Sequence, residues 1–267
     1  GPMGPHVAVA QFGGSTDKAA NRAAVRELVA QAAATGAELV VMPEYSMYSV
    51  QDPKVDYRDQ LEPIDGEFGS LVSALAKEQS VAIVAGMTVV DEQSDKGINT
   101  LLVVGADGEL IDTYEKVHLY DAFGFRESDR LRAGDPRAVT FELGGMTFGT
   151  MTCYDLRFPE MARLLVDAGA DALIVPAAWV AGPAKEDHWM TLLRARAIEN
   201  TVYVVASGQT GPQCTGLSMV VDPMGVVVAN AGEAKGVASA VLDPERVASV
   251  RKRNPSLANR RFTVAPK

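Results

Sequence analysis

The sequence predicts an α/β fold built around mixed β-sheets. Three observations support this prediction. Over residues 6–44, apolar strand-like runs flank an amphipathic helix, which is typical of a parallel crossover. Further along, pairs of strand-like runs are joined directly by glycine-containing turns, which is typical of antiparallel hairpins. The chain has 267 residues and is 47% hydrophobic, enough to bury one large core. We therefore expect a single domain over residues 4–267.

The first third of the chain predicts strands separated by helices. Strands are expected where β-branched and apolar residues run together, and helices where apolar residues recur at intervals of three and four. The helix after the first strand has a capping Ser or Thr and a terminating Gly36, and its apolar stripe comprises Val25, Leu28, Val29 and Ala32. The predicted order is a strand at 6–12, a helix at 15–36, a strand at 38–44, a polar loop at 45–65, a helix at 66–80 and a strand at 81–90.

The pattern then changes to hairpins. Residues 99–119 predict two strands about a turn at Asp107-Gly108, and residues 138–153 predict two more about Gly144-Gly145. The remaining elements are helices at 158–169 and 184–200 and strands at 171–179, 201–207, 216–223 and 225–230. The expected buried stripes of the two helices are Met161, Leu164, Leu165 and Ala168, and Trp189, Leu192, Leu193 and Ala197.

Composition narrows the function classes. The net charge of −9 gives no general attraction to nucleic acid or to anionic lipid. No run reaches the roughly 18 to 20 apolar residues of a membrane span. Two cysteines far apart and three scattered histidines predict neither a disulfide framework nor a metal site. With no phosphate-binding loop or dinucleotide fingerprint, we expect no cofactor. The lack of a membrane-length apolar run and the two isolated cysteines predict a cytoplasmic location. Gly1-Pro2 before Met3 is typical of a cleaved expression tag.

Three chemically reactive residues stand at the ends of predicted strands. Glu44 ends the strand at 38–44, Lys116 ends the second strand of the first hairpin, and Cys153 ends the second hairpin. In open α/β sheets, ligands bind outside the carboxyl ends of strands, where loops and helix N-termini meet. We therefore expect these three side chains to meet in one pocket.

The three residue types suit acyl transfer. A thiol at a helix N-terminus beside an ammonium has a lowered pKa, and the helix near Pro159 is expected to act so on Cys153. A carboxylate such as Glu44 takes the thiol proton, passes it to a leaving amine and then activates water. Lys116 and the backbone N–H of Tyr154 are candidates for stabilising the oxyanion. Taken singly, each residue also has a structural explanation: core thiol, solvated acid or strand-edge lysine.

Three segments resemble the signature segments of the nitrilase superfamily of carbon-nitrogen hydrolases. They are VVMPEYS at 40–46, YEKVHLYD at 114–121 and CYDLRFPE at 153–160. The resemblance implies that Glu44 is the general base and acid, Lys116 the oxyanion stabiliser and Cys153 the nucleophile. The segment FRESDRLRAGD resembles the family segment with a second glutamate, here Glu127, which positions the substrate and Glu44.

The resemblance also implies an architecture and an oligomer. The superfamily fold is an α-β-β-α four-layer sandwich with two mixed β-sheets. Its protomers pair through helices, which implies a homodimer or higher homo-oligomer here. The pairing elements would be the helices at 158–169 and 184–200, with the segment SLANRRF at 256–262 crossing to the partner.

The residues around Cys153 are most similar to the ω-amidase and deaminated-glutathione amidase branch. This similarity implies an amidase that converts a small carboxylate-bearing amide, 2-oxoglutaramate-like or deaminated-glutathione-like, to an acid and ammonia or an amine. The reaction would pass through a cysteine thioester and needs only water. Arg157 would bind the substrate carboxylate, or else form an ion pair with Asp155 or Glu160.

Five aromatic residues near the reactive positions are candidates for lining the pocket. Each of them could equally be an ordinary core residue. They are Tyr45, Tyr48, Phe123, Phe125 and Trp179. The loop YSMYSVQDPKVD after Glu44 departs from many relatives and leaves the size of the substrate open.

Three alternatives remain open at this point. The first is another branch of the superfamily, an N-carbamoyl amidohydrolase or an aliphatic amidase. The second is a Cys/His hydrolase that uses His118 as its base; the resemblance instead makes His118 a support to the site. The third is a protein without catalysis, a scaffold or metabolite-binding protein with the same fold.

Overall fold

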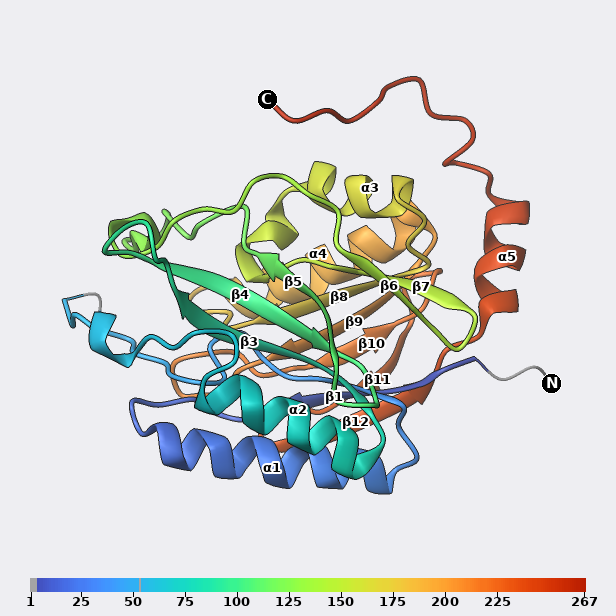
Figure 1. Cartoon of the computed structure of the whole chain (residues 1–267). Coiled ribbons are helices and arrows are strands. Elements are labelled where there is room, and N and C mark those ends of the chain that lie inside the picture. The colour runs from blue at the N-terminus through green and yellow to red at the C-terminus, as the bar shows by residue number, and fades with distance from the viewer. Residues whose placement is uncertain (1–3, 53) are drawn as a thin grey trace.

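The computed structural model describes residues 4–52 and 54–267, so the predicted tag remnant lies outside the described residues. The chain folds into four layers (Figure 1). Two helices cover the outer face of one β-sheet, a second sheet packs on its inner face, and two further helices cover the far side. This is the four-layer α-β-β-α arrangement that the resemblance implied.

The first sheet has six strands in the order β12-β1-β2-β3-β4-β5. Its outer face is covered by α1 (Lys18–Ala34) and α2 (Glu67–Gln79). The strands are β1 (His6–Gln11), β2 (Leu39–Val41), β3 (Ala82–Val90), β4 (Gly97–Val104), β5 (Leu110–Glu115) and β12 (Gly236–Val241).

The second sheet also has six strands, in the order β11-β10-β9-β8-β7-β6. It carries α3 (Pro159–Asp167) and α4 (Lys185–Asn200), and α5 (Pro244–Arg253) follows the last strand. The strands are β6 (Thr140–Leu143), β7 (Met146–Thr150), β8 (Ala172–Ala177), β9 (Tyr203–Gly208), β10 (Met219–Val221) and β11 (Val227–Asn230). Three short 3-10 helices are η1 (Arg58–Gln60), η2 (Glu127–Asp129) and η3 (Cys153–Arg157).

Both sheets are mixed, and they share one pairing pattern. Along β12-β1-β2-β3-β4-β5 the pairs are antiparallel, parallel, parallel, antiparallel and antiparallel, and β6-β7-β8-β9-β10-β11 repeats this sequence. The parallel pairs therefore lie inside each sheet. The segments that leave the carboxyl ends of β2 and β7 carry Glu44 and Cys153.

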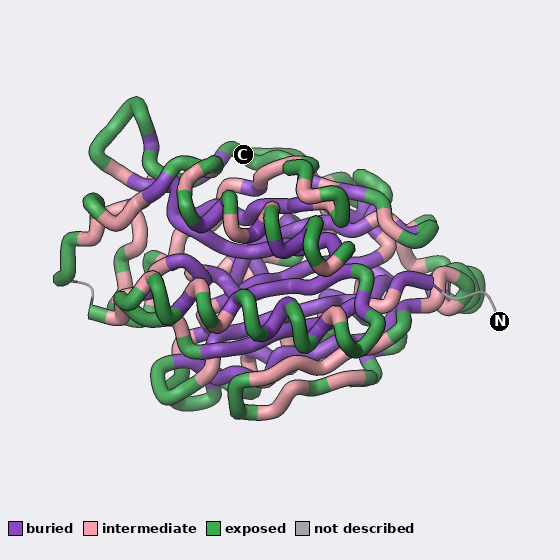
Figure 2. The backbone as a smooth tube through the Cα atoms, turned by 60° about the horizontal axis from the view of Figure 1, so that its bottom comes forward, coloured by how far each residue is buried: buried purple, intermediate pink, exposed green. Residues whose placement is uncertain are grey.

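The inner strands β2, β8 and β9 are buried on both faces, which explains their continuous apolar character. In β1, Val7 and Val9 belong to the core that includes the space between the sheets, whereas Ala8 and Ala10 pack in the core beneath α1 and α2. Figure 2 shows the buried tube running through the strands, with exposed residues along the helices and loops.

Helix α1 follows the sequence prediction closely. The stripe of Val25, Leu28, Val29 and Ala32 is buried, and Gly36 has a φ of 94° just after the helix ends. The cap differs from the expected Ser or Thr. Asp17 is the capping residue, and its carboxylate accepts a hydrogen bond from the N–H of Ala20 at 3.0 Å.

Other elements depart from the prediction because their burial depends on the partners they pack against. In α3, Ala168 is exposed and Leu164 only half-buried, while Ala162 and Val166 are buried instead. Strand β12 and helix α5 were not predicted from the sequence. Over the described residues, no helix is both long and apolar enough to cross a membrane.

Candidate active site

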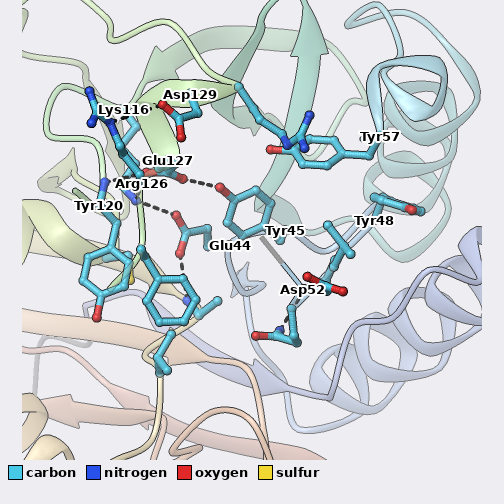
Figure 3. A pocket seen from close by; sticks show the side chains of 18 of the residues that line it. Glu44, Tyr45, Tyr48, Asp52, Tyr57, Lys116, Tyr120, Arg126, Glu127 and Asp129 are labelled. Carbon is cyan, nitrogen blue, oxygen red and sulfur yellow. Dashed lines mark hydrogen bonds and ion pairs between the residues drawn. The ribbon is translucent and has the colours of Figure 1, made fainter. Parts of the chain in front are cut away.

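Glu44, Lys116 and Cys153 line one cavity of about 320 Å³. Glu44 lies three residues after β2, Lys116 directly follows β5, and Cys153 lies three residues after β7. The first two strands belong to one sheet and the third to the other, so the cavity draws on both sheets. Figure 3 shows Glu44, Lys116 and Glu127 turned toward one another at one side of this cavity.

Each oxygen of the Glu44 carboxylate has a fixed partner. Oε2 accepts hydrogen bonds from Lys116 Nζ at 2.9 Å and from Asn99 Nδ2 at 2.8 Å. Oε1 accepts one from the backbone N–H of Ala178 at 2.9 Å. The side chain of Glu44 is only 2% exposed, so little water competes for its oxygens. These three hydrogen bonds therefore fix the carboxylate in one orientation.

Glu127 is held by four hydrogen-bond partners, one more than Glu44. Its Oε1 accepts hydrogen bonds from Lys116 Nζ at 3.0 Å and from the backbone N–H of Tyr120 at 2.8 Å. Its Oε2 accepts hydrogen bonds from the hydroxyl of Tyr45 and, at 3.2 Å, from Asn99 Nδ2. The amide of Asn99 thus bridges the two carboxylates, while Lys116 contacts both from another side.

The opposite charges of this cluster stabilise one another's ionised forms. Burial disfavours the charged form of Lys116, but the carboxylates of Glu127 and Glu44 outweigh it and raise the pKa of Lys116 well above its ordinary value. Burial likewise opposes the charged form of Glu127, but Lys116 and the hydroxyl of Tyr45 lower the pKa of Glu127. Lys116 is therefore an ammonium group at neutral pH.

The backbone beside Glu44 is confined by β3 and by Gln209. A β-carbon on Gly86 would lie 2.8 Å from the Cα of Glu44, so only glycine permits this approach. Gln209 Nε2 donates hydrogen bonds to the carbonyl oxygens of Glu44 at 2.8 Å and Tyr45 at 3.3 Å. Tyr45 itself has a φ of 59°, a left-handed conformation that is rare outside glycine.

Cys153 is the first residue of η3 and has a φ of 46°. Helix α3 begins only at Pro159. The sequence predicted a thiol with a lowered pKa, and this prediction was wrong. Burial raises the pKa of Cys153 well above its ordinary value, and the negative charge of Glu44 adds to the rise against the opposing effect of Lys116. The resting group is therefore a neutral thiol beside a carboxylate.

His118 does not line the large cavity. Its Nδ1 lies 2.8 Å from Oδ1 of Asp155, and its ring stacks on Phe158 with centroids 3.7 Å apart. Asp155 is fully buried and also accepts hydrogen bonds from the hydroxyl of Tyr114 and the N–H of Thr152. These contacts brace the turn that carries Cys153. They do not bring His118 into either cavity beside the thiol.

Of the two roles left open for Arg157, the structure does not show the ion pair with Asp155 or Glu160. Among the described residues, the side chain of Arg157 forms no ion pair with either acid, because Asp155 is turned inward and already bonded to His118. Arg157 Nη2 instead lies 3.2 Å from Nδ1 of His188. The guanidinium remains beside a second, smaller pocket that Cys153 also lines.

Four of the five aromatic residues proposed as walls divide between the two pockets, and the fifth, Phe123, lines neither. Tyr45, Tyr48 and Phe125 line the large cavity, whereas Trp179 lines the smaller pocket. The side chain of Tyr154 also lines the smaller pocket. Trp179 is tied down by a hydrogen bond from Nε1 to the carbonyl oxygen of Lys185 at 2.8 Å.

Three residues of the site were not found from the sequence. Asn99 interrupts an apolar strand, and such a polar residue in a buried run was the available signal. Tyr120 lines both pockets, and Lys185 lines the smaller one. Tyr120 lies in the quoted segment at 114–121 but was not singled out there, whereas Lys185 has no signal in its local sequence.

A family model for carbon-nitrogen hydrolases matches residues 6–252 of the chain. The protein belongs to the carbon-nitrogen hydrolase family. This finding confirms the resemblance seen in the three sequence motifs.

The similar proteins of this carbon-nitrogen hydrolase cover nearly its whole length. A deaminated glutathione amidase from Escherichia coli O157:H7 is 40% identical over 258 residues, covering 96% of this chain and 97% of the relative. The omega-amidase NIT3 from Saccharomyces cerevisiae is 38% identical, covering 97% and 94% of the two chains. The crystal structure of Saccharomyces cerevisiae Nit3, a member of branch 10 of the nitrilase superfamily, has a TM-score of 0.83 at 34% identity and covers 97% of each chain. These likenesses confirm the predicted fold.

Proposed function

We propose that this carbon-nitrogen hydrolase is an amidase for a small carboxylate-bearing amide, 2-oxoglutaramate-like or deaminated-glutathione-like. The products would be a carboxylic acid and ammonia or an amine. The observation that carries this proposal is a buried carboxylate, ammonium and thiol on one cavity: Glu44, Lys116 and Cys153. The names of the similar proteins, a deaminated glutathione amidase and an omega-amidase, support the choice of substrate class.

In the first half-reaction, Cys153 attacks the amide carbonyl while Glu44 takes the thiol proton. Proton transfer concerted with attack suits a thiol that is neutral at rest. The carbonyl oxygen becomes an oxyanion, which the Lys116 ammonium and the backbone N–H of Tyr154 stabilise. The protonated Glu44 then donates to the nitrogen, the C–N bond breaks, and a thioester on Cys153 remains.

The second half-reaction repeats the same proton transfers with water. Glu44 removes a proton from a water molecule as its oxygen attacks the thioester carbonyl. Collapse of the second tetrahedral intermediate breaks the C–S bond and releases the carboxylic acid. The proton held by Glu44 returns to the sulfur of Cys153, so the free enzyme is regenerated without any cofactor.

Glu127 and Asn99 act as positioning residues in this proposal. Glu127 bonds to Lys116 at 3.0 Å, and Asn99 bonds to both carboxylates. Neither needs to exchange a proton during the reaction. Their contribution is to keep the ammonium of Lys116 and the carboxylate of Glu44 in one geometry through both half-reactions.

The size of the large cavity favours an amine product over ammonia. Its volume of about 320 Å³ is far more than the roughly 10–15 Å³ of cavity that one water-sized molecule needs. Glu44 lines this cavity and would protonate the leaving nitrogen there. The room supports a deaminated-glutathione-like substrate, whose amide nitrogen carries a further chain, more than a primary amide.

The test is product release across a panel of candidate substrates. Deaminated glutathione is expected to turn over faster than 2-oxoglutaramate, short aliphatic amides, N-carbamoyl compounds and nitriles. Cys153→Ser should abolish turnover, while Cys214→Ser serves as the matched control and should keep it. Turnover of only N-carbamoyl compounds or nitriles would move the protein to another branch. Inactivity toward the whole panel would favour the scaffold or metabolite-binding alternative.

We also infer a homodimer or higher homo-oligomer, as the resemblance implied. The residues after α5 pass over α3 (Figure 1), where Arg260 Nη1 contacts Oδ1 of Asp167 at 2.7 Å. The side chain of Phe262 is 88% exposed there, which supports burial against a partner. Light scattering should give at least twice the chain mass, reduced by Phe262→Glu; a monomeric wild type would contradict the inference. A cytoplasmic location stays a prediction.

A further inference from the structure

Three neighbouring strands of the second sheet end beside the proposed active site. Strands β7, β8 and β9 are adjacent and parallel. Cys153 lies three residues after β7, Ala178 directly follows β8, and Gln209 directly follows β9. The backbone N–H of Gln209 donates a hydrogen bond to the carbonyl oxygen of Ala177 at 3.0 Å, which joins the ends of β8 and β9. Cys153, Ala178 and Gln209 therefore form one row of strand ends.

Glu44 belongs to the other sheet but is held by this row. Its side chain accepts a hydrogen bond from the N–H of Ala178 at 2.9 Å, and its backbone carbonyl accepts one from Nε2 of Gln209 at 2.8 Å. Gln209 Nε2 also donates to the carbonyl oxygen of Tyr45 at 3.3 Å. Among the described residues, Gln209 is the only hydrogen-bond donor to these two carbonyl oxygens. The backbone of the proposed base is thus attached to the sheet that carries Cys153.

The amide of Gln209 is held in one orientation. Its Oε1 accepts a hydrogen bond from the backbone N–H of Gly14 at 3.1 Å, so Nε2 faces the carbonyl oxygens of Glu44 and Tyr45. Gln209 is 2% exposed, and a β-carbon on Gly14 would lie 3.1 Å from Nε2, so the side chain has little room to turn. A flipped amide would set buried donors against donors and acceptors against acceptors, which is unfavourable.

The turn at Tyr45 depends on this amide. The φ of 59° at Tyr45 is a left-handed conformation that costs free energy in a residue with a β-carbon, and it persists only where the surroundings hold it. Gln209 binds the carbonyl oxygens of both peptide groups that flank the Cα of Tyr45. Relaxation of this turn would move Glu44, the preceding residue. The hydrogen bonds from Gln209 therefore oppose a displacement of the proposed base.

We propose that Gln209 is a positioning residue that fixes the carboxylate of Glu44 relative to the thiol of Cys153. This inference rests on the proposed amidase function and adds a residue to it. Gln209 lines neither of the two pockets and exchanges no proton during the reaction. It acts through geometry, because a base displaced by about 1 Å lowers the rate of reaction by about 10²-fold.

The kinetic test replaces Gln209 by methionine, which keeps the length of the side chain and removes its hydrogen bonds. On the fastest substrate of the panel, Gln209→Met should lower kcat by about 10²-fold and change KM little, because the pocket walls are untouched. Ser207→Ala is the matched control: its buried hydroxyl donates to the carbonyl oxygen of Val41 at 2.6 Å, another contact between the two sheets. An unchanged kcat in Gln209→Met, or an equal loss in Ser207→Ala, would overturn the inference.

The reactivity of the Cys153 thiol tests the inference without any substrate. The negative charge of Glu44 contributes to the raised pKa of Cys153. Because Gln209→Met displaces Glu44, the pH midpoint of iodoacetamide alkylation of Cys153 should fall, whereas Ser207→Ala should leave it in place. A midpoint that stays in place in Gln209→Met would overturn the inference. A lowered midpoint in a protein that hydrolyses none of the candidate substrates would support the role of Gln209 and contradict the proposed reaction.

A double variant separates positioning from a loss of packing. In Glu44→Gln the charge is already absent, so adding Gln209→Met should cause no further fall of the alkylation midpoint. A further fall of the same size would overturn the inference, because it would come from altered packing around Cys153. Gln209→Asn covers the case in which Gln209→Met does not fold: its amide is too short to reach both carbonyl oxygens, so kcat should again fall. Full kcat in Gln209→Asn would overturn the inference.

Discussion

The ammonium nitrogen of Lys116 lies 2.9 Å from Oε2 of Glu44, and both side chains are no more than 2% exposed. Their charges attract strongly because little water screens them. Each group also depends on the other, since an unpaired charge at this depth is strongly unfavourable. In the proposed reaction, one contact therefore both positions the base, Glu44, and holds the ammonium of Lys116 that stabilises the oxyanion.

Removing the ammonium should impair both activity and stability. In Lys116→Met, Glu44 and Glu127 face each other without a counter-charge and the proposed oxyanion loses a partner. We expect kcat/KM to fall about 10²–10³-fold. The free energy of unfolding should fall by roughly 3–5 kcal/mol. Urea denaturation and steady-state kinetics measure both, with exposed Lys252→Met as control. Full activity in Lys116→Met would exclude the proposed role.

The thiol of Cys153 should react more readily once the negative charge beside it is removed. Because Glu44 contributes to the raised pKa of Cys153, Glu44→Gln should shift the pH midpoint of iodoacetamide alkylation downward. Lys116→Met should shift the midpoint upward. Peptide mass spectrometry separates this site from Cys214, whose pKa burial raises to about 12 and which should stay slow in all variants. A midpoint that stays in place in both variants would contradict the electrostatic account.

The charge of Glu127 should make stability depend on pH in the acid range. The pKa of Glu127 is lowered in the folded protein, so its contribution is present above the pKa of an unfolded glutamate and is lost as the pH falls through the folded value. At pH 7, Glu127→Gln should lower the free energy of unfolding by roughly 2 kcal/mol. This loss of unfolding free energy should shrink toward zero as the pH falls. The exposed control Glu78→Gln should not change the free energy of unfolding at any pH. If Glu127→Gln lowered the free energy of unfolding equally at every pH, the loss would come from altered packing and not from the charge of Glu127.

Gly86 should be required for the position of Glu44. A β-carbon there would lie 2.8 Å from the Cα of Glu44, so Gly86→Ala displaces the proposed base. A displacement near 1 Å is expected to lower kcat about 10²-fold while the fold remains. Gly236→Ala is the matched control, because a β-carbon on Gly236 would have no neighbouring atom within 4 Å. Circular dichroism checks that the variant is folded. An unchanged kcat in Gly86→Ala would contradict the prediction, because the added β-carbon would then be accommodated without moving Glu44.

Local patterns were sufficient for most of the elements but not for the edges of the molecule. Helix α1 carries its buried stripe as predicted, because one face of it meets one sheet. Strand β12 escaped prediction, since half-buried Gly236–Val241 acquires its strand character by pairing with β1, more than 220 residues earlier in the chain. The buried face of α3 shifted for a similar reason: it depends on the contacts with α4 and the second sheet.

The sequence by itself determined the order of strands and helices up to β11, the family, and three reactive residues at strand ends, because these follow from local periodicity and motifs. Only the tertiary structure decided how those residues are used. It joined Glu44 to Glu127 through Asn99, raised the pKa of Cys153 by burial, and left Lys185 buried without an acidic partner among the described residues. Burial and charge compensation arise from segments distant in the chain, so no local pattern contains them.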